Sequence, residues 1–219
     1  MMSFLIVFLG KVRCDPALQT SYFFSPCLTA GNPPFGTPWG GKNAAEGVEQ
    51  AVNEEYAKGF DGRWGAGLPC GGDMQMLFLQ SAVDKMDDRY GRAAIIENVS
   101  PLFSGGTASG VSQIRRWLLE SDLIEAIIAL HTDLFYNTGI ATYIWVLSKN
   151  KRPERQGKIQ LIDASGFYSK LRKSLGNKKN EISAENRPAI TKLYADFMEN
   201  ERCKIYPNEE FIYREYTGM

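Results

Sequence analysis

The chain has 219 residues, 44% hydrophobic and 23% charged, which is enough for one globular domain with a real core and excludes a disordered tail. Lys and Arg number 25, as do Asp and Glu, so whole-chain charge does not indicate a nucleic-acid binder and any such role must rest on local patches. The four cysteines form no C-x-x-C pair and there is one histidine; we therefore expect no metal site, reduced thiols and a cytoplasmic location.

Residues 1–30 form a leader with no functional pattern. The apolar run at residues 4–9 is far too short to span a bilayer and has no basic segment before it. We expect no membrane association and favour either a buried strand or a start upstream of the true domain.

Glycine and proline dominate the segments that follow. The stretch GNPPFGTPWG at residues 31–40 and a second glycine cluster at residues 62–72 mark a long connection around a helix-compatible piece, residues 44–58. Connections of this length inside a compact domain are usually functional or mobile.

From residue 72 onward the hydrophobic pattern becomes regular. It predicts, in order, an amphipathic helix, a buried strand, a second helix, three further strands and an exposed helix, at residues 72–86, 92–100, 111–120, 123–131, 138–149, 158–165 and 183–200. This order predicts an α/β fold: the second half of a Rossmann-like doubly wound sheet that ends in an antiparallel edge hairpin, with a helical C-terminal tail.

The Asn-Pro-Pro-Phe corner at residues 32–35 has a specific chemical use. Asn before Pro is biased out of the helical region and Pro fixes φ, so the side-chain carbonyl of Asn32 and the backbone carbonyl of Pro33 can point toward one spot. Two acceptors there would bind both hydrogens of an exocyclic amino group, while the ring of Phe35 stacks on a planar substrate. The ordinary alternative is a plain proline turn.

Beyond this corner, five segments resemble, in order and spacing, the modification subunit of type I restriction-modification systems. They are GDMQMLFLQSAVDKM, GRAAIIENVSPLFSGG, SGVSQIRRWLLESDLIEAIIAL, DLFYNTGIATYIWVLSKNK and GKIQLIDAS. The resemblance covers residue 31 to the end, and FYNTGIATYIWVLS is more specific than NPPF. It implies a methyltransferase fold and an N6-adenine DNA methyltransferase that uses S-adenosylmethionine.

The resemblance also implies site residues and partners. Asn32, Pro33, Pro34 and Phe35 match the catalytic motif, and the substrate would be an adenine flipped out of double-stranded DNA, because its N6 is unreachable within the stack. Phe135 and Tyr136, which precede the late edge strand, would pack on the flipped base; ordinary core packing is the alternative. The implied partners are a specificity subunit, which selects the DNA target, and a restriction subunit.

Several other polar residues have structural interpretations beside functional ones. We expect a helix cap at Asp73 and at Ser109 or Gly110, and a solvent-side position for His131. Asn98 and Ser100 follow a predicted strand, where a ligand-facing role and a turn role are both open. The SGGTASG turn lacks the Lys-Ser/Thr pair of a phosphate loop.

The sequence departs from the family at the cofactor site. Neither the acidic-Pro and Gly-rich turn after the first strand nor the acidic residue that holds the ribose is found. We therefore divide the chain into an unmatched leader (1–30), the catalytic-motif half of the methyltransferase domain (31–165) and a basic, helical extension (166–219), and expect the chain to be inactive by itself.

Two alternatives remain open at this point. Residues 149–179 carry ten basic side chains against two acidic ones, an ordinary solvated face or the docking surface of a non-enzymatic remnant that binds DNA or a specificity subunit. N5-glutamine methylation of a release factor shares the Asn-Pro-Pro corner, but the long Gly-rich insert and the FYNTGIATYIWVLS run weigh against it.

Overall fold

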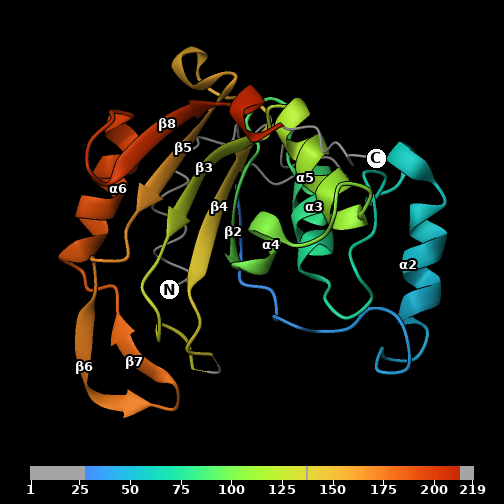
Figure 1. Cartoon of the computed structure of the whole chain (residues 1–219), viewed down its shortest axis with the longest axis horizontal. Coiled ribbons are helices and arrows are strands. Elements are labelled where there is room, and N and C mark those ends of the chain that lie inside the picture. The colour runs from blue at the N-terminus through green and yellow to red at the C-terminus, as the bar shows by residue number, and fades with distance from the viewer. Residues whose placement is uncertain (1–27, 137, 213–219) are drawn as a thin grey trace, which may run out of the picture.

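The computed structural model describes residues 28–136 and 138–212, so most of the predicted leader lies outside the described residues. Its centre is a six-stranded mixed sheet with the order β1-β2-β4-β3-β5-β8 (Figure 1). The strands of this sheet are β1 (Leu28–Gly31), β2 (Arg92–Asn98), β3 (Ile124–Ala129), β4 (Thr142–Ser148), β5 (Lys158–Asp163) and β8 (Cys203–Pro207). The helices are α2 (Val48–Tyr56), α3 (Gln75–Lys85), α4 (Ser100–Phe103), α5 (Gly110–Glu120) and α6 (Asn186–Asp196), with short 3-10 turns η2 (Gly59–Asp61), η3 (Pro153–Arg155) and η4 (Asn208–Phe211).

The strand directions distinguish the two ends of the sheet, because most strands finish at the same end. β1 pairs with β2 in parallel, β4 runs antiparallel to both β2 and β3, and β5 is parallel to β3. β1, β2, β3 and β5 therefore all end at the same edge, which we call the carboxyl edge. Ligands of open α/β sheets bind outside this edge.

The α/β class is confirmed, but β4 does not lie at the edge of the sheet. It sits between β2 and β3, and all its residues except Tyr143 are buried. A strand buried on both faces reads as a near-continuous apolar run, and YIWVLS has that composition. The sheet ends instead in the antiparallel pair β5–β8.

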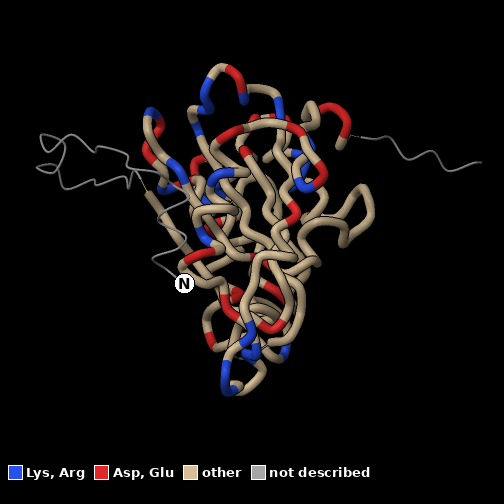
Figure 2. The backbone as a smooth tube through the Cα atoms, turned by 90° about the vertical axis from the view of Figure 1, so that its left-hand side faces the viewer, with Lys and Arg blue, Asp and Glu red and all other residues tan. Residues whose placement is uncertain are grey.

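A two-stranded hairpin extends beyond the carboxyl edge. It consists of β6 (Ser169–Leu175) and β7 (Lys178–Glu181), forms a sheet of its own and carries several Lys and Arg residues (Figures 1 and 2). The hydrophobic pattern does not predict this hairpin, because KLRKSLGNKKNE has no apolar face to bury.

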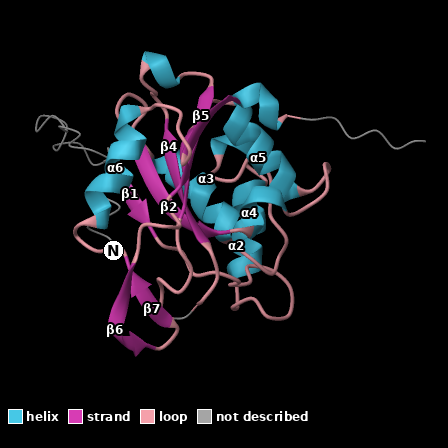
Figure 3. Ribbon diagram, turned by 60° about the vertical axis from the view of Figure 1, so that its left-hand side comes forward, coloured by secondary structure: helices cyan, strands magenta, loops and turns pink. Residues whose placement is uncertain are grey.

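Helices cover both faces of the central sheet (Figure 3). Along β2, Ala93 and Ile95 pack with α3 and α5, whereas Ala94 and Ile96 pack on the face covered by α6. Alternation along a strand sends successive side chains to opposite faces. The apolar run of β2 is therefore explained by burial on both sides.

The C-terminal helix is confirmed, but it is not an exposed one. Ile190 and Tyr194 of α6 are buried against the sheet. β8, from the same part of the chain, adds the last strand of that sheet. Among the described helices none combines the length and apolarity needed to cross a membrane.

Candidate active site

The Asn-Pro-Pro-Phe corner begins directly after Gly31, the last residue of β1. Asn32 and Pro34 are exposed, Pro33 is buried and Phe35 is half-buried. Within the described part of the chain no hydrogen bond engages the side chain of Asn32 or the carbonyl of Pro33. A Cβ at Gly31 would lie 3.0 Å from Cδ1 of Ile95, so glycine lets the backbone pass close to β2 at this point. No other described residue thus engages either acceptor proposed from the sequence, and Asn32 is exposed at the carboxyl edge.

The chain after the corner is tied to the segment before α3. The Trp39 backbone N–H donates to the Gly71 carbonyl (2.9 Å), and its indole N–H donates to the Cys70 carbonyl (3.1 Å). The Met74 N–H donates to the Thr37 carbonyl (3.0 Å). These bonds hold the long connection in place, so the corner is supported from both sides.

Phe35 and Phe135 meet the same core cluster. Both rings are partly buried and pack on the group that contains Leu130 and Leu134, next to β3. Tyr136 is 59% exposed, and the Lys178 ammonium lies 5.2 Å from its ring centroid. The structure brings both aromatic segments to the carboxyl edge, and contact of Phe135 or Tyr136 with a base stays a prediction.

Four other residues singled out from the sequence have structural roles. Oδ1 of Asp73 accepts from the N–H of Gln75 (3.1 Å), but the N-cap of α3 is Met74, so Asp73 lies one residue before the cap position expected for it. The N–H of Asn98 donates to Oε1 of Gln75 (3.0 Å), and Oδ1 of Asn98 accepts from the N–H of Ser100 (2.8 Å). Asn98 and Ser100 therefore build the turn after β2. Ser109 caps α5 by accepting from the Ser112 N–H (3.2 Å).

His131 is not the free, solvent-side residue expected from the sequence. Its Nδ1–H donates to the Ser165 carbonyl (2.8 Å), and its ring stacks on Tyr168 with the centroids 3.5 Å apart. The reason is topological, because β3 and β5 are parallel neighbours and the loops that follow them lie side by side. His131 ties these two loops together.

Glu97 is an unusual group that the sequence pattern did not single out. Its side chain is completely buried, and neither oxygen has a hydrogen-bond partner within the described residues. Burial, reinforced by the negative charge of Asp73, raises the pKa of Glu97 well above its usual value. The signal available in the sequence was a carboxylate inside the apolar run AAIIEN of β2.

The described residues do not fit the S-adenosylmethionine that the family implies. Such a site needs an acidic residue free to bind ribose hydroxyls, but the acids at or near the ends of these strands are either buried or already have a partner. Glu97 is buried, Oδ1 of Asp163 accepts from the Ser165 N–H (2.9 Å) and hydroxyl (2.5 Å), and Asp133 lies 4.0 Å from the Lys179 ammonium. Those bonds from Ser165 lower the pKa of Asp163.

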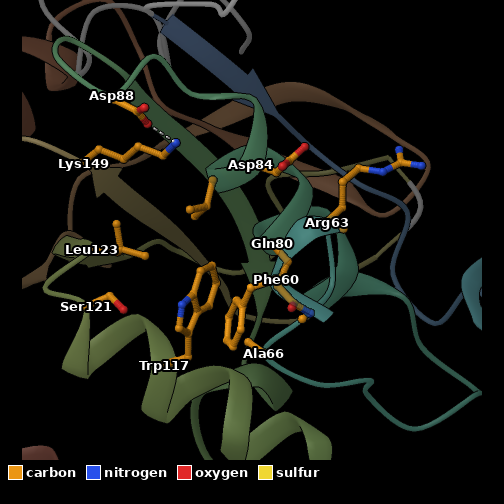
Figure 4. Close-up of a pocket in the computed structure, with 13 residues that line it drawn as sticks. Phe60, Arg63, Ala66, Gln80, Asp84, Asp88, Trp117, Ser121, Leu123 and Lys149 are labelled. Atoms are coloured by element: carbon orange, nitrogen blue, oxygen red, sulfur yellow. Dashed lines mark hydrogen bonds and ion pairs between the residues drawn. The ribbon is translucent and has the colours of Figure 1, made fainter. Parts of the chain in front are cut away.

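A hollow of about 440 Å³ lies at the other end of the sheet (Figure 4). Phe60 and Trp117 face each other there with ring centroids 6.4 Å apart, and the Lys149 ammonium bonds Asp88 at 2.7 Å. Leu123, just before β3, also lines it. No residue of the Asn-Pro-Pro-Phe corner contributes, so this hollow is separate from the candidate active site.

Comparison with known proteins agrees with the fold. A family model described as N-6 DNA Methylase matches residues 27–217. The chain belongs to this family, and the resemblance to type I modification subunits is confirmed.

Its relatives are subunits of restriction enzymes. The type I restriction enzyme MjaVIII methylase subunit of Methanocaldococcus jannaschii is 37% identical over 127 residues, which are 58% of this chain and 21% of the relative. The MjaIX methylase subunit of the same organism is 29% identical over 88% of this chain and 32% of the relative. The chain thus spans between a fifth and a third of the length of these relatives.

Solved structures show the same fold. The type I restriction-modification system methyltransferase subunit from Streptococcus thermophilus superposes with a TM-score of 0.68 at 21% identity, over 88% of this chain and 36% of that one. A modification subunit of a putative type I restriction enzyme from Vibrio vulnificus gives 0.60 at 18% identity, over 86% and 35% of the two chains.

Proposed function

We propose that this chain forms the base side of the active site of an adenine-N6 DNA methyltransferase in a type I restriction-modification system. The observation that carries the proposal is a pair of acceptors without hydrogen-bond partners among the described residues. They are the Asn32 side chain and the Pro33 carbonyl, directly after β1 and two or three positions before the half-buried Phe35. Family membership supports the same reaction.

The geometry suits an adenine rotated out of the duplex. Two acceptors bind the two hydrogens of N6, which draws the amino group out of conjugation and turns its lone pair toward an incoming methyl group. Phe35 would contact the purine face. The family implies S-adenosylmethionine as the methyl donor, and N6 loses one proton for the methyl group it gains.

The proposed setting follows from the relatives. Double-stranded DNA would be the substrate, with a specificity subunit choosing the target and a restriction subunit as the further partner, in the cytoplasm. We expect this chain by itself to transfer no label from S-adenosylmethionine to unmethylated DNA, because the carboxylates at the carboxyl edge are already engaged. Transfer above background would contradict this expectation.

The proposal is tested with base analogues. Two duplexes carry either adenine or purine, which lacks the 6-amino group, opposite an abasic site that lowers the cost of extrusion. Fluorescence anisotropy should show adenine bound more tightly by about 1–3 kcal/mol, the net value of two hydrogen bonds.

Variants assign this preference to the corner. Asn32→Ala should lose about half of it, since the Pro33 carbonyl remains. Asn43→Ala, an exposed asparagine of the same long connection, is the matched control and should keep it all. Equal affinity of the unaltered chain for adenine and purine would defeat the proposal and favour a module without chemistry.

A further inference from the structure

The β6–β7 hairpin has features that the base-side chemistry does not use. At about 3.3 Å per residue, β6 alone extends over roughly 20 Å, and the hairpin stands beyond the carboxyl edge (Figures 1 and 3). Most of its side chains are exposed, and only Asn180 is buried. A polar hairpin without a hydrophobic face is marginal by itself, so its place on the molecule depends on its attachments.

Positive charge is concentrated on this hairpin (Figure 2). Between Ser169 and Glu181 the only acidic residue is Glu181, against the cations Lys170, Arg172, Lys173, Lys178 and Lys179. Of these, Lys179 alone has a carboxylate within 4.0 Å among the described residues. Cations gathered without counter-charges repel one another, and a polyanion would remove that repulsion.

The hairpin is attached to the loop that carries the candidate base-contacting aromatics. The Asn177 N–H donates to the Tyr136 carbonyl (3.1 Å), while the Asp133 carbonyl accepts from the N–H groups of Lys179 (3.0 Å) and Asn180 (3.1 Å). The buried side chain of Asn180 donates to the Thr132 carbonyl (3.2 Å). These hydrogen bonds thus attach the hairpin to residues 132–136.

We propose that the hairpin binds the phosphates beside the extruded adenine and holds residues 132–136 in position against that base. This inference rests on the function proposed above. Nucleic acid fits this surface better than an acidic protein does, since exposed aromatic and aliphatic side chains, Tyr136 and Leu175, stand among the cations. The interaction reads no sequence, because it is made to the DNA backbone.

Salt dependence tests the phosphate interactions. The adenine duplex described above is titrated with the chain at several KCl concentrations. The triple variant Lys170→Gln/Arg172→Gln/Lys173→Gln should lower the slope of log K against log salt by about 0.9 for each phosphate that the variant no longer neutralises. The matched control removes two lysines and one arginine from the opposite edge, Lys85→Gln/Arg152→Gln/Lys158→Gln, all exposed, and should keep the slope.

The same titrations separate this inference from the proposed function. The hairpin variant should keep the preference for adenine over purine, because its cations do not touch N6. A slope equal to that of the unaltered chain, or no DNA binding by that chain at the lowest salt, would overturn the inference. Loss of the adenine preference in the unaltered chain would instead overturn the proposed function.

A second pair of variants tests how the loop is held. Asn180→Ala removes the bond to Thr132 and leaves every cation in place, so the salt slope should stay unchanged while the adenine preference falls. Asn177→Ala is the control, because only its backbone N–H bonds the loop. An unchanged preference in Asn180→Ala would remove the loop-positioning role.

Discussion

Two polar regions of this molecule differ in whether their hydrogen-bonding groups have partners within the protein. Between the sheet and α6, the buried carboxylate of Glu125 is 2.6 Å from the Arg92 guanidinium, 2.8 Å from the Tyr194 hydroxyl and 3.4 Å from Arg155. At the carboxyl edge, Asn32 stands exposed with no partner among the described residues.

Buried polar groups with several partners stabilise the fold, whereas an exposed polar group without a partner is free to bind a ligand. Arg155 also donates to Oε1 of Gln160 (2.9 Å) and lies 4.6 and 4.3 Å above the rings of Tyr194 and Phe197. Buried charges are tolerated only with such partners. Asn32 is exposed to solvent instead, so a substrate amino group could bind it at little desolvation cost.

The largest expected effect comes from breaking the buried cluster. Glu125→Ala leaves the buried guanidinium of Arg155 and the partly buried one of Arg92 without their carboxylate. It should lower the free energy of unfolding by about 3–5 kcal/mol, measured by urea denaturation. Glu120→Ala removes the exposed partner of Arg116 and should cost about 0.5 kcal/mol. Similar losses for both variants would show that burial is not what makes the Glu125 cluster important.

Glu97 gives a pH-dependent test. Because its pKa is raised in the folded chain, the folded state keeps a proton that the unfolded state releases. The free energy of unfolding should therefore be highest below about pH 4.5, the ordinary value, as far as Glu97 contributes, and should fall as the pH rises toward the raised pKa.

Glu97→Gln should remove this dependence above pH 4.5, since the amide does not titrate. The lowered pKa values of Asp88 and Asp163 act at lower pH and with the opposite sign, so they do not hide the effect. Denaturation midpoints between pH 5 and 8 that fall equally in both proteins would rule out a buried, protonated Glu97.

Ser109 is a hydrogen-bonded helix cap, and its contribution to stability should be of ordinary size. Ser109→Ala removes the acceptor for the Ser112 N–H at the start of α5 and should destabilise the protein by about 1 kcal/mol. Thermal unfolding measures the loss, and Ser109→Asp should restore most of it. A neutral Ser109→Ala would mean that water caps this helix equally well.

The smallest effect on stability is expected at the corner itself. Asn32→Ala should change the free energy of unfolding by no more than about 0.5 kcal/mol, as at other exposed positions without partners. The Asn32→Ala substitution should lower only the preference for adenine over purine. A loss comparable to that of Glu125→Ala would place Asn32 with the groups that hold the fold.

Local pattern predicted much of the sheet and the corner. β2, β3 and β5 and the helices α3 and α5 were visible because burial repeats with the period of a strand or a helix. β1 was harder to see, since LTAG has little strand character and is extended because it pairs with residues 92–95 of β2.

What the sequence did not reveal depends on partners far along the chain. That β4 is interior follows from its two neighbours and not from its own residues. The burial of Tyr194 depends on Glu125, 69 positions earlier, which accepts a hydrogen bond from its hydroxyl group. The β6–β7 hairpin was missed because main-chain bonds to residues 132–136, which leave no mark in the pattern, hold it in place.

The interior place of β4 has a consequence for how the chain is made. In the fold β2 and β3 do not pair with each other, because each pairs with β4. Residues 142–148, which form β4, leave the ribosome after both of these strands. Until then their apolar edges stay open, and such edges favour aggregation. Slow translation through residues 99–141 should therefore lower the yield of soluble protein, whereas delay after residue 150 should matter much less.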